Sequence, residues 1–122
     1  MMDIRSFLTT LVFLFFTQFF VAQKSYNALV YEGNKKFDAK DYNAATGKYL
    51  EAISEKSGNY TAHYNLGNSL YKSKKYEEAS AEYQKSIGLT KSKYEKAAAL
   101  YNLGNVSMQS NNPEKAADFY KQ

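Results

Sequence analysis

The chain contains no cysteine, and its 122 residues include only one proline and one histidine. Without cysteine, disulfides, thiolate metal sites, cysteine nucleophiles and a lipid-modified amino-terminal cysteine are excluded. The single histidine, His63, excludes a metal site or proton relay built on two histidines, and no serine has a histidine and an acid close to it in sequence. Glycine-rich phosphate loops are also absent. We therefore expect no catalytic residue, no metal and no cofactor, and interpret His63 as a packing residue.

Arginine is absent after Arg5, and lysine carries almost all of the net charge of +4. The lysines are spread along the chain among aspartates and glutamates. Nucleic-acid binding requires positive charge concentrated on one face, usually with arginine forks for the phosphates. We therefore interpret the lysines as a solvated surface and expect no nucleic-acid partner.

The phenylalanines are concentrated at the start of the chain, since six of the eight lie before residue 21. Arg5 precedes an uncharged run over residues 7–22, and a helix over this run would span roughly 24 Å. That is short of the bilayer hydrocarbon thickness of about 30 Å. The pattern predicts a secretory signal peptide over residues 1–22, and so an exported protein of the periplasm or cell envelope. An uncleaved membrane anchor is the alternative, because Phe20 is bulky for a cleavage site and Asp3 weakens the positive start.

One short motif recurs along the rest of the chain. Tyr-Asn-Leu-Gly-Asn occurs at residues 64–68 and 101–105, and a weaker copy, Tyr-Glu-Gly-Asn, at 31–34. The three glycines are 34 and 37 residues apart. An alanine follows each glycine after twelve residues and a tyrosine after sixteen. Such a period indicates one structural unit used repeatedly. The recurring residues are Gly33, Gly67 and Gly104, then Ala45, Ala79 and Ala116, then Tyr49, Tyr83 and Tyr120.

Within each unit the apolar residues recur at helical spacing, and a polar break such as residues 73–75 divides the unit in two. Each unit is therefore predicted to be two antiparallel helices joined by a tight turn. Glycine inside a helix costs on the order of 1 kcal/mol relative to alanine, a cost tolerated where a facing helix comes very close. We expect the recurring alanines to face the glycines, and the tyrosines to fill the space between neighbouring hairpins.

Capping residues mark the predicted helix boundaries. Asp41 and Asn59 can cap helices that begin directly after them. Asn112 precedes Pro113, which suits the first helical position. Ser92 and Glu95 have the spacing of a capping box, which would begin the first helix of the third unit almost a turn early.

From Tyr26 to Gln122 the sequence resembles tetratricopeptide repeats, whose motif has 34 residues. Leu66 and Leu103 precede the glycine as is common in that family, and aromatic residues open the second helices. Glu32 departs from the leucine column. The resemblance implies an all-α fold, an α-solenoid of antiparallel helix hairpins with two full repeats and a truncated third. The predicted repeats are 26–59, which is diverged, 60–93, and 94–122, whose first helix is extended. The aromatic residues that open the second helices are Tyr42 and Tyr76. A second departure lies between the units, where Ser57 and Lys91 stand in place of a proline.

In that family the first helices of successive repeats line a concave groove that binds a peptide of another protein. An asparagine amide can donate to and accept from a peptide backbone together, and tyrosine suits interfaces. The alternative is that these asparagines bond neighbouring helices and hold the stack together. Carried over column by column, the predicted groove contains Asn34, Phe37, Tyr64, Asn65, Asn68, Tyr71, Lys72, Tyr101, Asn102, Asn105 and Met108.

Some members of the family grip a carboxyl-terminal peptide with a clamp of lysine and arginine. Val30 and Ala98 stand in two columns where such clamps carry a cation, and Lys72 alone could not replace them. We therefore expect no binding of chaperone tails.

A secretory start, one diverged unit and two copies of Tyr-Asn-Leu-Gly-Asn are similar to the tetratricopeptide proteins of the Bacteroides aerotolerance group. Those are envelope proteins encoded beside von Willebrand factor A domain proteins and a MoxR-type ATPase. The resemblance implies a non-enzymatic scaffold of an envelope complex, with a von Willebrand factor A domain protein as partner and membrane contact only through the amino-terminal segment. The alternative is a self-associating structural subunit or fragment that stacks through its incomplete third repeat.

Overall fold

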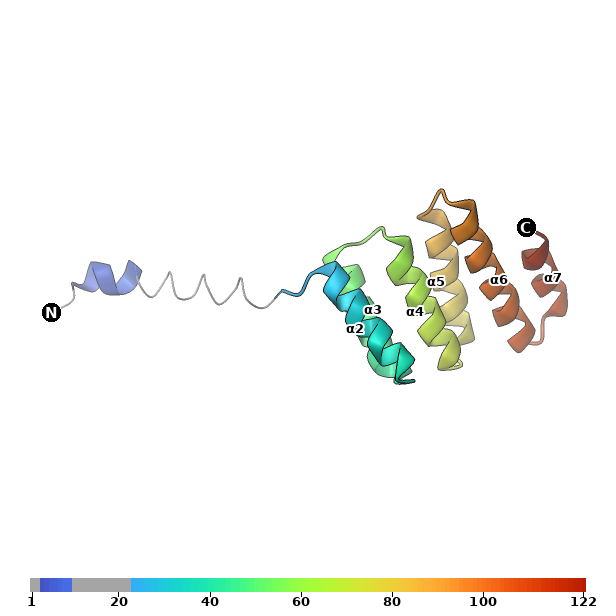
Figure 1. Cartoon of the computed structure of the whole chain (residues 1–122), viewed down its shortest axis with the longest axis horizontal. Helices are drawn as coiled ribbons and strands as arrows, with labels where there is room; N and C mark the ends of the chain where they lie inside the picture. The colour runs from blue at the N-terminus through green and yellow to red at the C-terminus, as the bar shows by residue number, and fades with distance from the viewer. Residues whose placement is uncertain (1–2, 10–22) are drawn as a thin grey trace.

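The computed structural model of the chain describes residues 3–9 and 23–122. Residues 4–9 are helical, and six further helices form three antiparallel hairpins in a row (Figure 1). The described residues contain no strand. This confirms the predicted all-α solenoid of helix hairpins. The helices are α2 (Tyr26–Asp38), α3 (Tyr42–Glu55), α4 (Tyr60–Lys72), α5 (Tyr76–Gly88), α6 (Lys93–Gln109) and α7 (Pro113–Lys121).

Most of the predicted signal peptide, residues 1–2 and 10–22, lies outside the described residues. In the part of the chain that the structure does describe, no helix is both long and apolar enough to cross a membrane. The signal peptide and the alternative anchor therefore both remain predictions.

The hairpins join through their neighbouring helices, so that α3 packs on α4 and α5 packs on α6. One hydrophobic cluster runs through all three hairpins, and a smaller one lies where α2, α3 and α4 meet. The core is therefore continuous along the row, as expected for a repeat protein in which each unit buries its neighbour's apolar face. The larger cluster contains Ala45, Tyr49, Leu66, Leu70, Ala79, Tyr83, Leu103 and Val106.

Three predicted helix caps are confirmed. Asp41 accepts from the Ala44 amide at 3.2 Å, and Ser92 accepts from the Glu95 amide at 3.3 Å. Asn112 accepts from the Lys115 amide at 3.1 Å, with proline in the first turn. Counted from the recurring glycine, α6 begins four residues earlier than α4 does, as predicted.

Two details of the caps were predicted wrongly. Asn59 precedes α4 but its side chain makes no capping hydrogen bond. The capping box at Ser92 is only half formed, because the Ser92 amide donates to Thr90 Oγ1 at 3.1 Å rather than to Glu95. A nearby hydroxyl already satisfies the donor that the glutamate would have bonded.

The turns inside the three hairpins share one backbone geometry. Lys40, Lys74 and Asn111 all have left-handed φ, at 61°, 62° and 56°. The amide of the next residue then bonds a carbonyl five residues back, as in Asp41 to Lys36 at 2.9 Å. This is a helix C-terminal motif that usually employs glycine. Three residues that carry a side chain adopt it here because the turn must close the hairpin within a few residues.

A close approach does occur at each recurring glycine, and the atoms nearest to it belong to a tyrosine ring. A Cβ on Gly33 would lie 2.5 Å from Tyr49 Cε1, and one on Gly67 would lie 2.7 Å from Tyr83 Cε1. The ring of Tyr120 stands in the same way against Gly104. Each tyrosine therefore packs on the glycine of its own hairpin, closer than the alanine that was expected to face it.

Gly67→Ala should destabilise the protein by about 1–3 kcal/mol, because the added methyl overlaps the buried Tyr83 ring. Gly47→Ala is the matched control, since a Cβ there meets nothing within 4 Å. It should stabilise the protein by about 0.5–1 kcal/mol through helix propensity. Urea unfolding followed by circular dichroism measures both. Equal effects of the two substitutions would contradict the tyrosine contact.

Stability should also fall in alkaline solution. Burial raises the pKa of Tyr49 to about 12, and the negative charge of Asp38 adds to this; burial likewise raises the pKa of Tyr83. Unfolded tyrosines lose their proton near pH 10. The folded state therefore binds more protons between about pH 10 and the raised pKa, so its stability is complete below pH 10 and decreases through this window.

Urea unfolding at a series of pH values should show this decrease, and Tyr49→Phe should make it shallower. Tyr31→Phe, at a residue that is 64% exposed, is the matched control for loss of an exposed tyrosine hydroxyl. The same alkaline slope in Tyr49→Phe and in the unchanged protein would refute the assignment.

Candidate functional site

The eleven predicted groove residues all lie on the first helices of the hairpins, α2, α4 and α6. Five asparagines of this set form side-chain hydrogen bonds, either with one another or with a tyrosine. We call these five the asparagine ladder: Asn34, Asn65, Asn68, Asn102 and Asn105.

Within each hairpin, the tyrosine whose ring packs on the glycine donates a hydrogen bond from its hydroxyl group to a ladder asparagine. Tyr49 Oη lies 2.7 Å from Asn34 Oδ1, and the equivalent Tyr83–Asn68 distance is also 2.7 Å. The third hairpin repeats the bond between Tyr120 and Asn105 at 2.8 Å. Because the asparagine directly follows the glycine on which the ring packs, one tyrosine contacts both residues of the Gly-Asn pair.

Between hairpins, the first asparagine of Tyr-Asn-Leu-Gly-Asn donates a hydrogen bond to the preceding hairpin. Asn65 Nδ2 donates to Asn34 Oδ1 at 3.1 Å. Asn102 Nδ2 donates to Asn68 Oδ1 at 3.3 Å and to Tyr64 Oη at 2.9 Å. Both asparagines of Tyr-Asn-Leu-Gly-Asn therefore have a structural role, one inside a hairpin and one between two hairpins.

This arrangement changes what the ladder can offer to a ligand. The Oδ1 atoms of Asn34 and Asn68 each accept two hydrogen bonds, which uses both lone pairs of a carbonyl oxygen. Among the described residues, nothing accepts from Nδ2 of Asn34, Asn68 or Asn105. The prediction that these amides both donate and accept is therefore wrong for Asn34 and Asn68, which can only donate. The alternative role in holding the stack together is confirmed for their oxygens.

Several aromatic rings of the predicted groove are already packed against other aromatic rings of the fold. Tyr64 is held between Tyr60 and Tyr83, with ring centroids 5.2 and 5.8 Å away. Phe37 and Tyr71 each contact the tyrosine that opens their own second helix, at 5.3 and 5.6 Å. These three rings therefore serve mainly to pack the hairpins.

Three apolar side chains beside the ladder are exposed. Tyr101 and Met108 were in the predicted set, and Tyr31 was missed. Tyr31 stands in the column of Asn65 and Asn102, two residues before the glycine. The repeat period could have identified it, but its residue type differs from the other two copies.

The outer face of the first hairpin is polar where the later hairpins are apolar. Glu32 stands in the column of Leu66 and Leu103, and pairs with Lys24 at 2.7 Å and Lys48 at 3.4 Å. The hydrogen bond from Lys24 lowers the pKa of Glu32, and that of Lys24 is raised in turn. The two leucines are buried by a preceding hairpin, whereas Glu32 has no described hairpin on its outer side. A charged residue is suited to that position.

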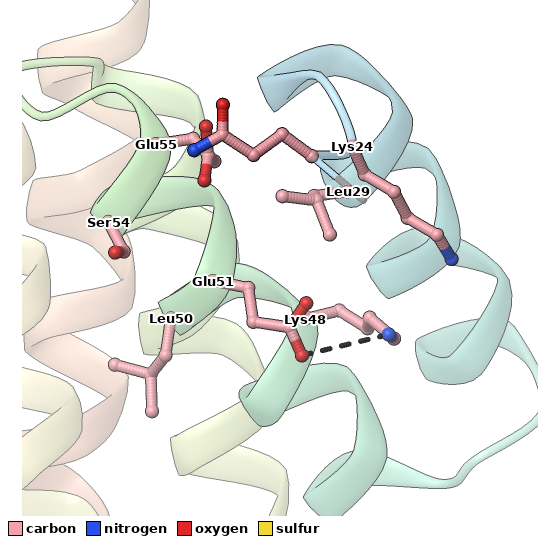
Figure 2. A pocket seen from close by; sticks show the side chains of 8 residues that line it. Lys24, Leu29, Lys48, Leu50, Glu51, Ser54 and Glu55 are labelled. Atoms are coloured by element: carbon pink, nitrogen blue, oxygen red, sulfur yellow. Dashed lines mark ion pairs between the residues drawn. The ribbon is translucent and has the colours of Figure 1, made fainter. Parts of the chain in front are cut away.

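A pocket of about 440 Å³ opens beside this charged face. Figure 2 shows its lining side chains on α3 and on the segment just before α2, with Leu29 of α2 between the helices and Lys48 paired with Glu51. Lysine and glutamate side chains of opposite sign largely satisfy one another here. Nothing in this arrangement points to a particular ligand.

The single histidine also has a partner. His63 Nδ1 lies 2.6 Å from Glu82 Oε2, and Lys85 reaches the other oxygen of Glu82 at 3.0 Å. The pair joins α4 to α5 across the second hairpin. No group of three or more metal-ligating side chains occurs in the described residues. The absence of an enzymatic function remains a prediction.

Solved structures share this fold. The second tetratricopeptide domain of Spaghetti (RPAP3), bound to the HSP90 peptide SRMEEVD, is 21% identical with a TM-score of 0.72, over 80% of this chain and 88% of that one. The N-terminal domain of stress-induced protein-1 (STI-1) from C. elegans is 24% identical, with a TM-score of 0.71 over 77% of each chain. MamA is 20% identical with a TM-score of 0.75, over 99% of this chain and 72% of that one.

No curated protein matches the sequence at a significant level. The sequence profile of the tetratricopeptide repeat matches residues 59–122, which is just over half of the chain. This region contains α4 to α7, with both complete copies of the motif. The chain therefore belongs to the tetratricopeptide repeat family.

Proposed function

We propose that the protein is a non-enzymatic adaptor that binds an extended segment of another protein along the asparagine ladder. The observation that carries this is that a tyrosine holds the carbonyl of Asn34, Asn68 and Asn105 from inside the hairpin. The amide nitrogen of each is left without an acceptor in the described structure. A row of such donors suits the main-chain carbonyls of an extended peptide, whatever its side chains.

The ladder is prepared for binding before the ligand arrives. An asparagine with a bonded carbonyl has its amide orientation fixed, so less side-chain entropy is lost when a ligand is bound. The exposed side chains of Tyr31, Tyr101 and Met108 lie on the same helices and add apolar contact area. Main-chain donors and adaptable apolar contacts together favour a ligand recognised by its backbone and a few apolar residues.

The charge of the site favours a neutral segment over an acidic tail. The peptide bound to the Spaghetti domain, SRMEEVD, is acidic. Here Val30 and Ala98 occupy two columns in which clamp-type relatives carry cations. Lys72 is exposed but stands alone. We infer that the partner segment carries little negative charge and need not end in a free carboxylate.

The test is selection of dodecapeptides from a phage-displayed library on the immobilised protein, followed by calorimetric titration of the recovered peptides. Asn68→Asp with Asn105→Asp keeps an acceptor for each tyrosine and removes the outward donor. This variant should weaken binding about tenfold or more, as expected when hydrogen bonds to a buried ligand group are lost. The peptide SRMEEVD should bind less tightly than the selected peptides.

The matched control is Asn43→Asp with Gln84→Glu, which adds the same charge at exposed positions on second helices. Binding to the control should be unchanged, and circular dichroism should show equal helicity in both variants. Peptides that bind the ladder variant as tightly as the unchanged protein would refute the proposal, as would failure to select any peptide.

We also propose that the protein acts in the periplasm or cell envelope, within a complex of the aerotolerance type that includes a von Willebrand factor A domain protein. Arg5, the apolar run over residues 7–22 and the similarity to the Bacteroides aerotolerance group support this. The absence of cysteine is compatible with an oxidising compartment, since no thiol is present to be oxidised.

Expression of the full chain with a C-terminal tag in a Gram-negative host tests export. The periplasmic product should have an intact mass that begins at or near Gln23, because a signal peptide is removed. Leu14→Arg breaks the apolar run and should leave the precursor in the cytoplasm, whereas Lys121→Arg should be processed normally. A full-length product in the membrane fraction would instead show an anchor.

A further inference from the structure

The two asparagines of Tyr-Asn-Leu-Gly-Asn leave different atoms unused. In the second asparagine, Asn68 or Asn105, the carbonyl oxygen accepts from a tyrosine and the nitrogen has no acceptor among the described residues. In the first asparagine, Asn65 or Asn102, the nitrogen donates to the preceding hairpin. No described group donates to the Oδ1 atom of Asn65 or Asn102. Each complete copy of the motif therefore has one unused donor and one unused acceptor.

The amide of Asn102 is fixed through its nitrogen. Its Nδ2 atom donates to Tyr64 Oη at 2.9 Å and to Asn68 Oδ1 at 3.3 Å. An amide nitrogen carries only two hydrogens, so both are used and the group cannot rotate without losing a bond. Asn65 Nδ2 makes the corresponding bond to Asn34 Oδ1 at 3.1 Å. In both copies the fold holds a carbonyl oxygen in place without using it.

These two oxygens are open to solvent. Within the described parts of the chain, Tyr26 Oη is the only buried side-chain nitrogen or oxygen that lacks a hydrogen bond. The Oδ1 atoms of Asn65 and Asn102 lack one too, so they are not buried. Asn65 lies on α4, which packs between the first and third hairpins, and its oxygen is nevertheless free. The accessibility of this atom therefore does not depend on which elements adjoin the described row.

The free donor and the free acceptor of one copy lie close together. They are three residues apart on one helix, at 65 and 68 on α4 and at 102 and 105 on α6. Residues at this spacing are neighbours on a helix surface, with Cβ atoms about 5–6 Å apart. A residue of an extended chain presents its own N–H and C=O toward the same side, and paired strands bond through these two groups. A neighbouring donor and acceptor suit that pair of main-chain groups.

We propose that each complete copy of the motif binds both main-chain groups of one residue in an extended partner segment. This inference rests on the proposed adaptor function and adds main-chain N–H groups to the carbonyls assigned there. Asn68 Nδ2 donates to the carbonyl of a residue whose N–H donates to Asn65 Oδ1. Asn105 and Asn102 bind a second residue in the same way.

The proposal defines the kind of segment that the ladder accepts. In an α-helix the N–H groups beyond the first turn are bonded within the helix, and proline has no N–H. The bound segment is therefore extended rather than helical, and proline is excluded from two of its positions.

The first hairpin binds the segment differently. Asn34 has a free nitrogen like Asn68, but Tyr31 stands in the column of Asn65 and Asn102 and has no amide oxygen. A carbonyl of the segment can be bound there, whereas the matching N–H has no fixed acceptor. We therefore expect two important N–H groups in the segment rather than three.

The test replaces each amide of a selected dodecapeptide in turn by an ester, which removes one N–H and adds no bulk. Each ester peptide is titrated with the full chain by calorimetry. Esters at two positions should weaken binding by about five- to tenfold, and esters elsewhere by less than about twofold, because only two N–H groups bind the ladder. Proline should be absent from the same two positions in the selected sequences.

The variant Asn102→Ala identifies one of the two positions. It lacks the acceptor, so the ester at that position should cost no further affinity, whereas the ester at the other position should still weaken binding. Asn43→Ala, at an exposed position on α3, is the matched control and should show both losses. Circular dichroism compares the helicity of the two variants, and the ester series on the unchanged chain decides the question if Asn102→Ala does not fold.

The outcomes separate this inference from the proposed function. If no ester weakens binding while Asn68→Asp with Asn105→Asp still does, the ladder binds carbonyls only and this inference alone is wrong. Losses at both positions that persist in a folded Asn102→Ala variant would also overturn it, by placing the N–H contacts elsewhere. Peptides that bind the aspartate variant as tightly as the unchanged chain would overturn the proposed function, and this inference with it.

Discussion

Each hairpin depends on one contact, in which a tyrosine ring of the second helix packs on the glycine of the first. The glycine costs the helix on the order of 1 kcal/mol, and the contact recovers it by burying a large aromatic side chain and by a hydrogen bond worth about 0.5–1.5 kcal/mol. The bond goes to the asparagine directly after the glycine, at 2.7 Å in the first two hairpins. Ring position, helix spacing and amide orientation are therefore fixed together. A change at one of the three residues alters the other two, which explains why all three recur as a set.

The asparagine ladder couples this internal contact to the outer surface. The oxygens of Asn34 and Asn68 hold neighbouring hairpins together, and the nitrogens of Asn34, Asn68 and Asn105 have no acceptor in the described structure. The two interpretations of the asparagines, binding a peptide or holding the stack, therefore do not compete, because they use different atoms of the same side chain. Stability and recognition are linked as a result. Removal of a whole side chain would disturb both, whereas a change confined to the nitrogen separates them.

The sequence was sufficient to predict the repeat, the hairpins and most caps, because periodic apolar residues and capping side chains act locally. It could not specify which groups meet. The periodicity placed Gly67, Ala79 and Tyr83 in buried columns, but whether the ring or the methyl faces the glycine depends on how the two helices are rotated. The left-handed φ of Lys74 left no signal either, since glycine or asparagine normally marks that conformation. The groove residues were placed on the correct helices, yet the saturated oxygen of Asn68 follows from a partner 34 residues away.

The two outer faces of the described row are chemically different, and one column shows why. Leucine at position 66 or 103 is buried because a hairpin precedes it, and Glu32 in that column is instead solvated and paired with lysines. A charged outer face prevents further stacking on the first hairpin, which is the role of a polar cap in repeat proteins. A hollow of about 350 Å³ beside α6 and α7 has no charged side chain in its lining, and Tyr120 there is exposed with an incompletely used Asn105. The outer faces of the described row therefore differ in chemistry, because the column that carries Glu32 in the first hairpin carries buried leucine in the other two.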